Sequence, residues 1–382
     1  MKIALLTLPL YTNYGSVLQA FALKSYLERF GHDVWLIDNH RQEPPVGNLF
    51  LRTVLRRAVE SLFHHKEIFA ELNDARTRGY KMAEIEKFIY RHLSPRTFPV
   101  YDEEDFIALR DEGFDLFIVG SDQVWRPRYA KKITRYFFSF LEGTSLRRIS
   151  YAASFGTTAC EYTPAEREQC ARLITGFSGV SVRESSAIGQ CRDYFGYDGA
   201  RQVLDPTLLL TAEDYAPFLK GTPASEETLF CYLFRLKGGM RRALGRLASQ
   251  RGLRILRRTD RTSESRGRMP GIEQWLTELR NARHVVTDSF HACAFCILFH
   301  KSFAACINRR RGSARTSRLE QPDHGIRNGP CGHSRLTDRL ERRRPETGGP
   351  PGRFPGISCP LRGDGAGAPY ASRLISSTRA CT

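Results

Sequence analysis

The sequence predicts an α/β protein built from two successive units, each a parallel sheet with helices packed on it. Short apolar runs alternate with segments of helical periodicity along most of the chain. Small polar residues follow several of these runs, at the position where a parallel strand ends and a ligand commonly binds. At 382 residues the chain also exceeds the length at which one hydrophobic core keeps growing, so two domains are expected.

The first forty residues show this pattern clearly. Lys2–Thr7 predicts a buried strand, Val17–Phe30 a helix with apolar residues at helical spacing, and Asp33–Asp38 a second strand. The three segments predict a βαβ unit whose first loop lies at the carboxyl end of a strand. Further strands are expected at 115–119, 148–153, 179–182, 202–204, 229–233, 253–256 and 284–287.

We expect an N-terminal domain over residues 1–200 and a C-terminal domain over 201–315 that is incomplete. Residues 41–109 have a basic, helical pattern and are interpreted as a helical insertion in the first domain. In the tail, residues 316–382, Gly and Pro make up about 27% of the residues and valine does not occur. Such a composition predicts a low-complexity, disordered segment.

The formal net charge of +17 would suit a polyanionic partner, whether nucleic acid, an anionic membrane or a phosphorylated metabolite. About nine of these charges fall from Arg309 onward, so the body of the chain is only mildly basic. A nucleic-acid binder is therefore one hypothesis, but no recognised binding module occurs and no specific nucleic-acid partner is expected. The basic stretch Arg52–Arg57 would allow at most peripheral contact with a membrane.

The cysteines and the hydropathy predict a cytoplasmic protein. Ten cysteines at irregular spacing fit reduced thiols better than a disulfide framework. No apolar run is long enough to span a bilayer, and no small-residue cleavage site follows the N-terminal apolar run.

The loop before the first helix is a candidate anion site. Asn13, Tyr14, Gly15 and Ser16 open a helix that continues through Gln19, so free backbone N–H groups and the helix dipole would favour a bound anion. Gly15 would permit close approach. The alternative is a plain strand-to-helix turn capped by Asn13 or Ser16.

Polar residues after the next two strands form a second candidate site. Ser121, Asp122, Gln123 and Trp125 are suited to recognising sugar hydroxyls or a phosphate, with Trp125 as a stacking platform. Ser154 follows the neighbouring strand. A capped turn fits the spacing of the first four residues equally well.

Two later strands are followed by residues that could carry chemistry. Arg183 could bind a carboxylate or phosphate through parallel hydrogen bonds, or could instead form a salt bridge with Glu184 or another acid. Asp288, Ser289 and His291 follow the strand ending near 287. His291 could exchange a proton near neutral pH, or could merely cap or pack the following helix.

His291, Cys293, Cys296 and His300 could be taken for metal ligands. The residues between them are apolar and predict the packing face of a buried helix, so no metal site is expected.

Six stretches of this sequence resemble, in order, those of the polysaccharide pyruvyl transferases. They are NYGSVLQAFAL, FIVGSDQVWRP, ISYAASFG, VSVRESS, VLDPTLLL and VVTDSFHACAF. The likeness covers Met1 to about Arg315 and is weakest between Arg41 and Leu109. It implies two Rossmann-like domains in a GT-B-like arrangement, with a cleft between them.

The resemblance also implies a reaction. It implies transfer of pyruvate from phosphoenolpyruvate onto two hydroxyls of a sugar, giving a cyclic ketal on a cell-surface glycan precursor in exopolysaccharide biosynthesis. The acceptor can be lipid-linked, which would place the cytoplasmic enzyme at the inner face of the membrane. No cofactor is expected, because phosphoenolpyruvate is itself the donor substrate.

His291 suits the acid/base role in that reaction, and Arg183 suits a donor anchor. Some eukaryotic relatives carry an arginine two residues before the histidine, where this chain has Ser289. That donor contact must come from elsewhere or be absent, so the case for a donor anchor depends more on Arg183. The other residues expected to bind substrate are Asn13, Tyr14, Gly15, Gln19, Ser121, Asp122, Gln123, Trp125, Ser154, Asp288 and Ser289.

Two alternatives stay open. The same two-domain cleft would accommodate glycosyl transfer from a nucleotide sugar. The likeness ends at about Arg315, and the composition beyond it is that of GC-rich DNA translated out of frame, so the chain could also be an inactive, frameshifted family member. A natural disordered tail would have a similar composition.

Overall fold

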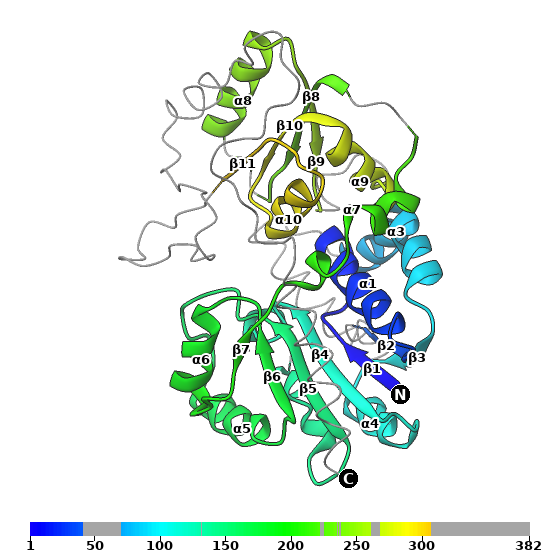
Figure 1. Ribbon diagram of the computed structural model, residues 1–382, viewed down its shortest axis with the longest axis vertical. Coiled ribbons are helices and arrows are strands. Elements are labelled where there is room, and N and C mark those ends of the chain that lie inside the picture. The colour runs from blue at the N-terminus through cyan, green and yellow to red at the C-terminus, as the bar shows by residue number, and fades with distance from the viewer. Residues whose placement is uncertain are drawn as a thin grey trace.

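The computed structural model describes residues 1–40, 70–130, 132–221, 225–234, 236, 238–260 and 268–306. Its strands form two parallel sheets, which confirms the expected α/β class (Figure 1). The strand order is β3-β2-β1-β4-β5-β6-β7 in the N-terminal sheet and β11-β10-β8-β9 in the C-terminal sheet. The tail 316–382 and residues 41–69 of the expected helical insertion, which include Arg52–Arg57, lie outside the described residues.

The N-terminal sheet follows the predicted apolar runs closely. Its strands are β1 (Lys2–Leu6), β2 (Asp33–Asn39), β3 (Arg96–Val100), β4 (Leu116–Asp122), β5 (Arg147–Ala153), β6 (Gly179–Val182) and β7 (Arg201–Gln202). Its helices are α1 (Tyr14–Glu28), α3 (Ala70–His92), α4 (Glu103–Ala108), α5 (Pro164–Ile174) and α6 (Ser186–Phe195). Ile3 and Leu5 of β1 pack into one apolar cluster and Ala4 and Leu6 into another, because successive strand residues face opposite sides of the sheet.

The interpretation of residues 41–109 as wholly helical is wrong for Arg96–Val100. These residues form β3, which pairs with β2 at the edge of the sheet. Pro99 is tolerated there because an edge strand has one side on which no backbone N–H is needed. The helices α3 and α4 flank the strand, which explains why the surrounding pattern is helical.

The C-terminal sheet contains β8 (Ser225–Tyr232), β9 (Arg254–Arg258), β10 (Ala282–Thr287) and β11 (Phe303–Ala305). Its helices are α7 (Ala212–Tyr215), α8 (Gly238–Gln250), α9 (Ile272–Asn281) and α10 (Phe290–Leu298). Residues of α8 pack on one face of this sheet, and residues of α9 and α10 join the cluster on the other. The sequence predicted β8, β9 and β10 but not the short β11.

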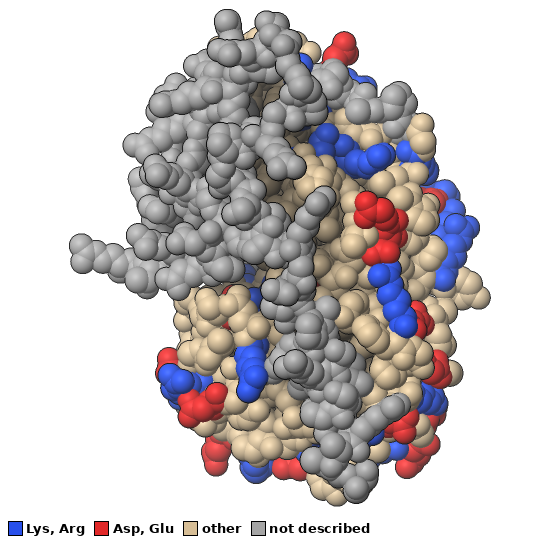
Figure 2. All heavy atoms as spheres, viewed as in Figure 1, with Lys and Arg blue, Asp and Glu red and all other residues tan. Residues whose placement is uncertain are grey.

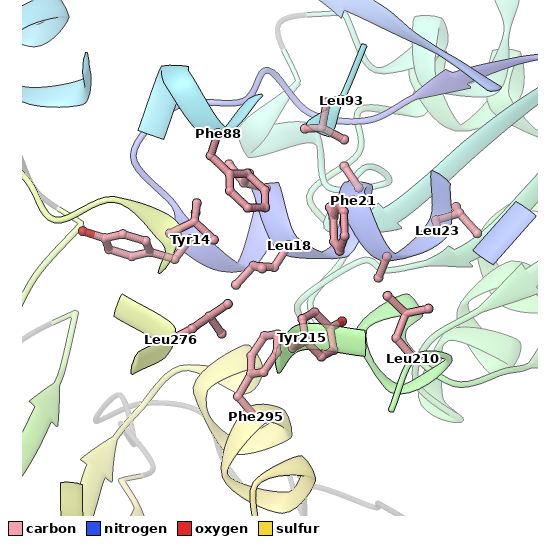
Figure 3. Packing of buried hydrophobic residues seen from close by; sticks show 14 of the residues in the cluster. Tyr14, Leu18, Phe21, Leu23, Phe88, Leu93, Leu210, Tyr215, Leu276 and Phe295 are labelled. Atoms are coloured by element: carbon pink, nitrogen blue, oxygen red, sulfur yellow. The ribbon is translucent and has the colours of Figure 1, made fainter. Parts of the chain in front are cut away.

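The two sheets share one apolar core. The cluster that contains α1 and one face of the N-terminal sheet also contains Tyr215, Leu276 and Phe295 from the C-terminal half (Figure 3). The side chains of α1 are buried on nearly every face, since the helix lies between the first sheet and the helices α9 and α10. Residues from both sheets therefore meet in this shared core.

The described surface carries charges of both signs. In the space-filling view, lysines and arginines alternate with acidic residues over the lower, N-terminal part of the molecule (Figure 2). Within the described part of the chain, no helix is long and apolar enough to cross a membrane.

Candidate active site

The candidate site lies where the carboxyl edge of the N-terminal sheet meets the start of α10. Ser121 and Asp122 end β4, Arg183 directly follows β6, and Asp205 follows β7. Parallel strands end at a common edge, so these side chains from distant parts of the chain converge. His291, in the first turn of α10, enters the same group from the other domain.

Arg183 is buried among carboxylates, with 9% of its side chain exposed. Its Nη1 lies 3.1 Å from Oδ2 of Asp205 and 3.8 Å from Oδ1 of Asp122, and its Nε lies 3.7 Å from Oε2 of Glu184. Burial alone would lower the pKa of this guanidinium, but the three carboxylates raise the pKa above its ordinary value. The Phe290 ring lies 4.5 Å from Cζ. In this structure Arg183 therefore forms salt bridges, which was the alternative to binding a substrate anion.

His291 is held between the two domains. Its side chain is 7% exposed, and its Nε2 lies 3.6 Å from Oδ2 of Asp205, an ion-pair distance too long for a hydrogen bond. The opposite side of the imidazole lies against α1, where a Cβ built on Gly15 would come within 2.1 Å of Nδ1. Gly15 thus permits close approach, but to the imidazole of His291 and not to an anion.

The amides at the start of α1 are already satisfied, which contradicts the expected anion site. Oδ1 of Asn13 accepts hydrogen bonds from the backbone N–H groups of Gly15 at 2.9 Å and Ser16 at 3.2 Å. The alternative interpretation, a strand-to-helix turn capped by Asn13, is therefore correct. Oγ of Ser16 donates to Oδ2 of Asp122 at 2.5 Å, so this turn contacts the site through its hydroxyl group.

Gln19 and Ser121 form hydrogen bonds that hold the end of β4 in place. Oε1 of Gln19 accepts a hydrogen bond from the backbone N–H of Ser121 at 2.9 Å, and both side chains are fully buried. Oγ of Ser121 donates to Oδ2 of Asp205 at 3.1 Å. Both residues therefore fix the end of β4 beside the charged group.

Tyr14 and Trp125 are core residues, so the prediction that they contact the substrate is wrong. The ring of Tyr14 is fully buried and stacks on Trp275 of α9, with centroids 5.2 Å apart. Trp125 is equally buried, stacks on Phe137 and donates from Nε1 to the carbonyl oxygen of Tyr136. A buried indole cannot serve as a stacking platform for a sugar.

The remaining predicted residues make contacts of their own. Ser154 Oγ donates to Glu184 Oε1 at 2.8 Å, so it supports a partner of Arg183. Gln123 accepts a hydrogen bond from Arg126. In the C-terminal domain, Asp288 accepts from the backbone N–H of Phe234, and Ser289 is the N-cap of α10.

Asp205 is the site residue that the sequence did not single out. It lies within the motif VLDPTLLL and is the one charged side chain in that apolar run. A single charged residue in an apolar run could have identified Asp205 as a site residue, because a buried charge needs partners. Burial would raise the pKa of the carboxyl, but the charges of His291 and Arg183 and the hydroxyl of Thr207 hold it well below its usual range.

Metal ligation has no geometric basis around α10. Among the residues that the structure describes, no three His, Cys, Asp or Glu side chains are grouped so as to hold a metal ion. Cys296 is buried in the shared apolar core, and burial raises the pKa of its thiol.

The interface role of Tyr14 makes a testable prediction. Tyr14→Ala should lower the free energy of unfolding by roughly 3–5 kcal/mol, because it empties a space in the shared core. Tyr14→Phe should cost only about 1 kcal/mol, the hydrogen bond from its hydroxyl to the carbonyl oxygen of Pro270. Urea denaturation measures both, with the half-exposed Tyr129→Ala as control. Equal stability of wild type and Tyr14→Ala would disprove the role.

Comparison with solved structures supports the fold. UDP-GlcNAc 2-epimerase from Methanocaldococcus jannaschii matches with a TM-score of 0.53 at 11% identity, over 99% of this chain and 100% of that chain. The same enzyme in complex with UDP-GlcNAc and UDP gives a TM-score of 0.50 at 12% identity, over 99% and 100%. At such identities the likeness shows the fold alone: two Rossmann-like domains in the GT-B-like arrangement that the motifs implied.

Sequence comparison identifies the family. No curated protein matches the chain significantly. The family model for polysaccharide pyruvyl transferase, however, matches residues 13–310, which include all six motifs and every residue of the site described above. The chain therefore belongs to the polysaccharide pyruvyl transferase family.

Proposed function

We propose that this protein transfers the pyruvyl group of phosphoenolpyruvate onto two hydroxyls of a sugar in a glycan precursor, forming a cyclic ketal and releasing inorganic phosphate. The observation that carries the proposal is the meeting of Arg183 and His291, from separate domains, within reach of one carboxylate, Asp205. Family membership supplies the reaction class. The acceptor sugar and its lipid linkage are parts of the proposal.

The residues suit the chemistry that such a transfer requires. A proton must be added to the methylene carbon of phosphoenolpyruvate, which leaves positive charge at the neighbouring carbon for a sugar oxygen to attack. That oxygen loses its proton, which restores the proton donor. Phosphate then departs with the C–O bond electrons, and the second sugar hydroxyl closes the ketal as its proton passes to the departing phosphate. His291 is the proton donor in this proposal, since imidazole exchanges protons near neutral pH.

Arg183 is the donor anchor in this proposal. A guanidinium has five N–H donors, and the ion pairs engage Nη1 and Nε, so the group can hold its carboxylates and still contact an anionic substrate. The surrounding carboxylates keep the guanidinium in a fixed position beside Phe290. A fixed donor costs no reorganisation when charge develops in the transition state.

The site would operate in the cytoplasm, at the inner membrane face where the acceptor is lipid-linked. Cys170, Cys191 and Cys231 are buried free thiols, which suits a reducing compartment. No cofactor is needed for the reaction as proposed, because the donor substrate already carries the activated pyruvyl group.

Phosphate release from phosphoenolpyruvate with a panel of sugar acceptors tests the proposal. His291→Ala should lower the rate by about 10²–10⁴-fold, the usual contribution of a general acid. His300→Asn is the matched control, since His300 follows the same helix but is exposed and has a positive φ that asparagine tolerates.

The other hypotheses give different results in the same assay. Release of a nucleotide from a sugar nucleotide, with none of phosphate from phosphoenolpyruvate, would identify a glycosyltransferase. Activity that appears only after the reading frame beyond Arg315 is restored would identify this chain as an inactive family member. Phosphate release that survives His291→Ala would remove the proposed role of that histidine.

A further inference from the structure

Asp205 occupies a site prepared by the N-terminal domain. Its side chain is fully buried. Oδ1 accepts hydrogen bonds from the backbone N–H of Thr207 at 3.0 Å and from the Thr207 hydroxyl at 2.7 Å. Oδ2 accepts from Ser121 Oγ at 3.1 Å and from Arg183 Nη1 at 3.1 Å. Residues at the carboxyl edge of the N-terminal sheet and in the turn after β7 therefore hold both oxygens in place.

The same oxygen faces the histidine of the other domain. His291 Nε2 lies 3.6 Å from Oδ2 of Asp205, and within the described part of the structure this buried nitrogen has no hydrogen-bond partner. On the other side the ring packs closely against the start of α1, where a Cβ built on Gly15 would come within 2.1 Å of Nδ1. The imidazole is thus confined between α1 and one carboxylate, with its Nε2 directed at a group that is itself fixed.

We propose that Asp205 is a positioning residue for pyruvyl transfer: it holds the imidazolium of His291 and the guanidinium of Arg183 in one arrangement across the domain boundary. The inference rests on the proposed function and adds a residue to it. Asp205 does not touch the substrate in this proposal. It acts through the two cationic groups on either side of it.

The charges around His291 support this role. Arg183 is a cation close to Oδ2 of Asp205, and by itself it would disfavour a second positive charge nearby. Asp122 and Glu184 balance Arg183, which leaves Asp205 as the carboxylate that faces the imidazole, while α1 presents the backbone of Gly15. A protonated imidazole is the form that can give a proton to the substrate.

The pKa of Asp205 is consistent with this arrangement. Burial raises it, but the charges of His291 and Arg183 lower it to well below the usual range, so the carboxylate is ionised at neutral pH.

The test replaces Asp205 with asparagine, which has the same size but no charge, in the full chain. We expect kcat for phosphate release to fall by roughly tenfold or more, with a smaller change in KM for phosphoenolpyruvate. Asp198→Asn is the control, because Asp198 is exposed and pairs with Arg192 at the surface.

Nuclear magnetic resonance of the ¹⁵N-labelled imidazole gives a readout that needs no turnover. At one fixed pH, the His291 signals, assigned by their loss in His291→Gln, should differ in chemical shift between wild type and Asp205→Asn, because the carboxylate that faces Nε2 is gone. Identical chemical shifts would overturn the inference, whether or not phosphate is released. Changed chemical shifts without phosphate release would instead support the contact and count against the proposed function.

Thr207→Val keeps the inference testable if Asp205→Asn does not fold. Valine has nearly the volume of threonine but removes the hydroxyl that donates to Oδ1, leaving the charge of Asp205 in place. We expect a severalfold lower kcat with unchanged KM, because the carboxylate is held less firmly. A fully active Thr207→Val variant would overturn the inference.

Discussion

Gly15→Ala is expected to abolish most phosphate release from phosphoenolpyruvate although it changes a single hydrogen to a methyl group. The added Cβ would lie 2.1 Å from Nδ1 and 2.4 Å from Cγ of His291, so the ring must move or the domains must separate. A displacement of about 1 Å at a catalytic group can cost 10²-fold in rate, and we expect a loss of at least that size.

The same substitution would ordinarily stabilise a helix. Alanine in place of a helical glycine adds roughly 0.4–1 kcal/mol, because the unfolded chain loses conformational freedom. A loss of activity in Gly15→Ala would therefore not be explained by a weaker α1. Gly189→Ala in α6 is the matched control, since its added Cβ meets no other atom within 4 Å. Full activity of Gly15→Ala would show that His291 does not work from the position described here.

The parts of the fold that the sequence predicts are those whose signal is local. The strands β1, β4 and β10 are buried in parallel sheets and appear as short apolar runs. The edge strand β3 gives no such run, because it carries Pro99 and is half exposed. The short β11 has only three residues, too few for a periodic pattern.

The site was predicted in part for the same reason. Polar residues after buried strands located Ser121, Asp122, Arg183 and His291, since the ends of parallel strands converge. The burial of Tyr14 depends on Trp275, more than two hundred residues away, and no spacing along the chain encodes that contact. Local patterns therefore give candidates for a site, whereas the contacts between domains decide which of them reach it.

Arg183→Met is expected to have the second large effect, on both activity and stability. Methionine fills a similar volume but leaves Asp122, Glu184 and Asp205 without the cation that they share. Breaking a buried ion pair in this way costs about 3–5 kcal/mol, and the loss of a fixed donor group should lower kcat/KM by roughly 10²–10³-fold. Arg192→Met, at an exposed pair with Asp198, should change little.

The pH dependence of stability distinguishes this electrostatic cause from a simple packing defect. In wild type the depressed pKa of Asp205 means that its stabilising contribution is present above the unfolded-state pKa and is lost as pH falls through the lower, folded-state pKa. Without Arg183 that pKa would rise relative to wild type, because one of the groups that lower it is gone, so the folded variant would bind a proton at a higher pH than folded wild type. The deficit in unfolding free energy should therefore shrink as pH falls through the folded-state pKa of the variant. Urea midpoints measured from about pH 7 downward check this: a deficit that stays constant over the whole range would mean that Arg183 stabilises the site by packing and not by charge.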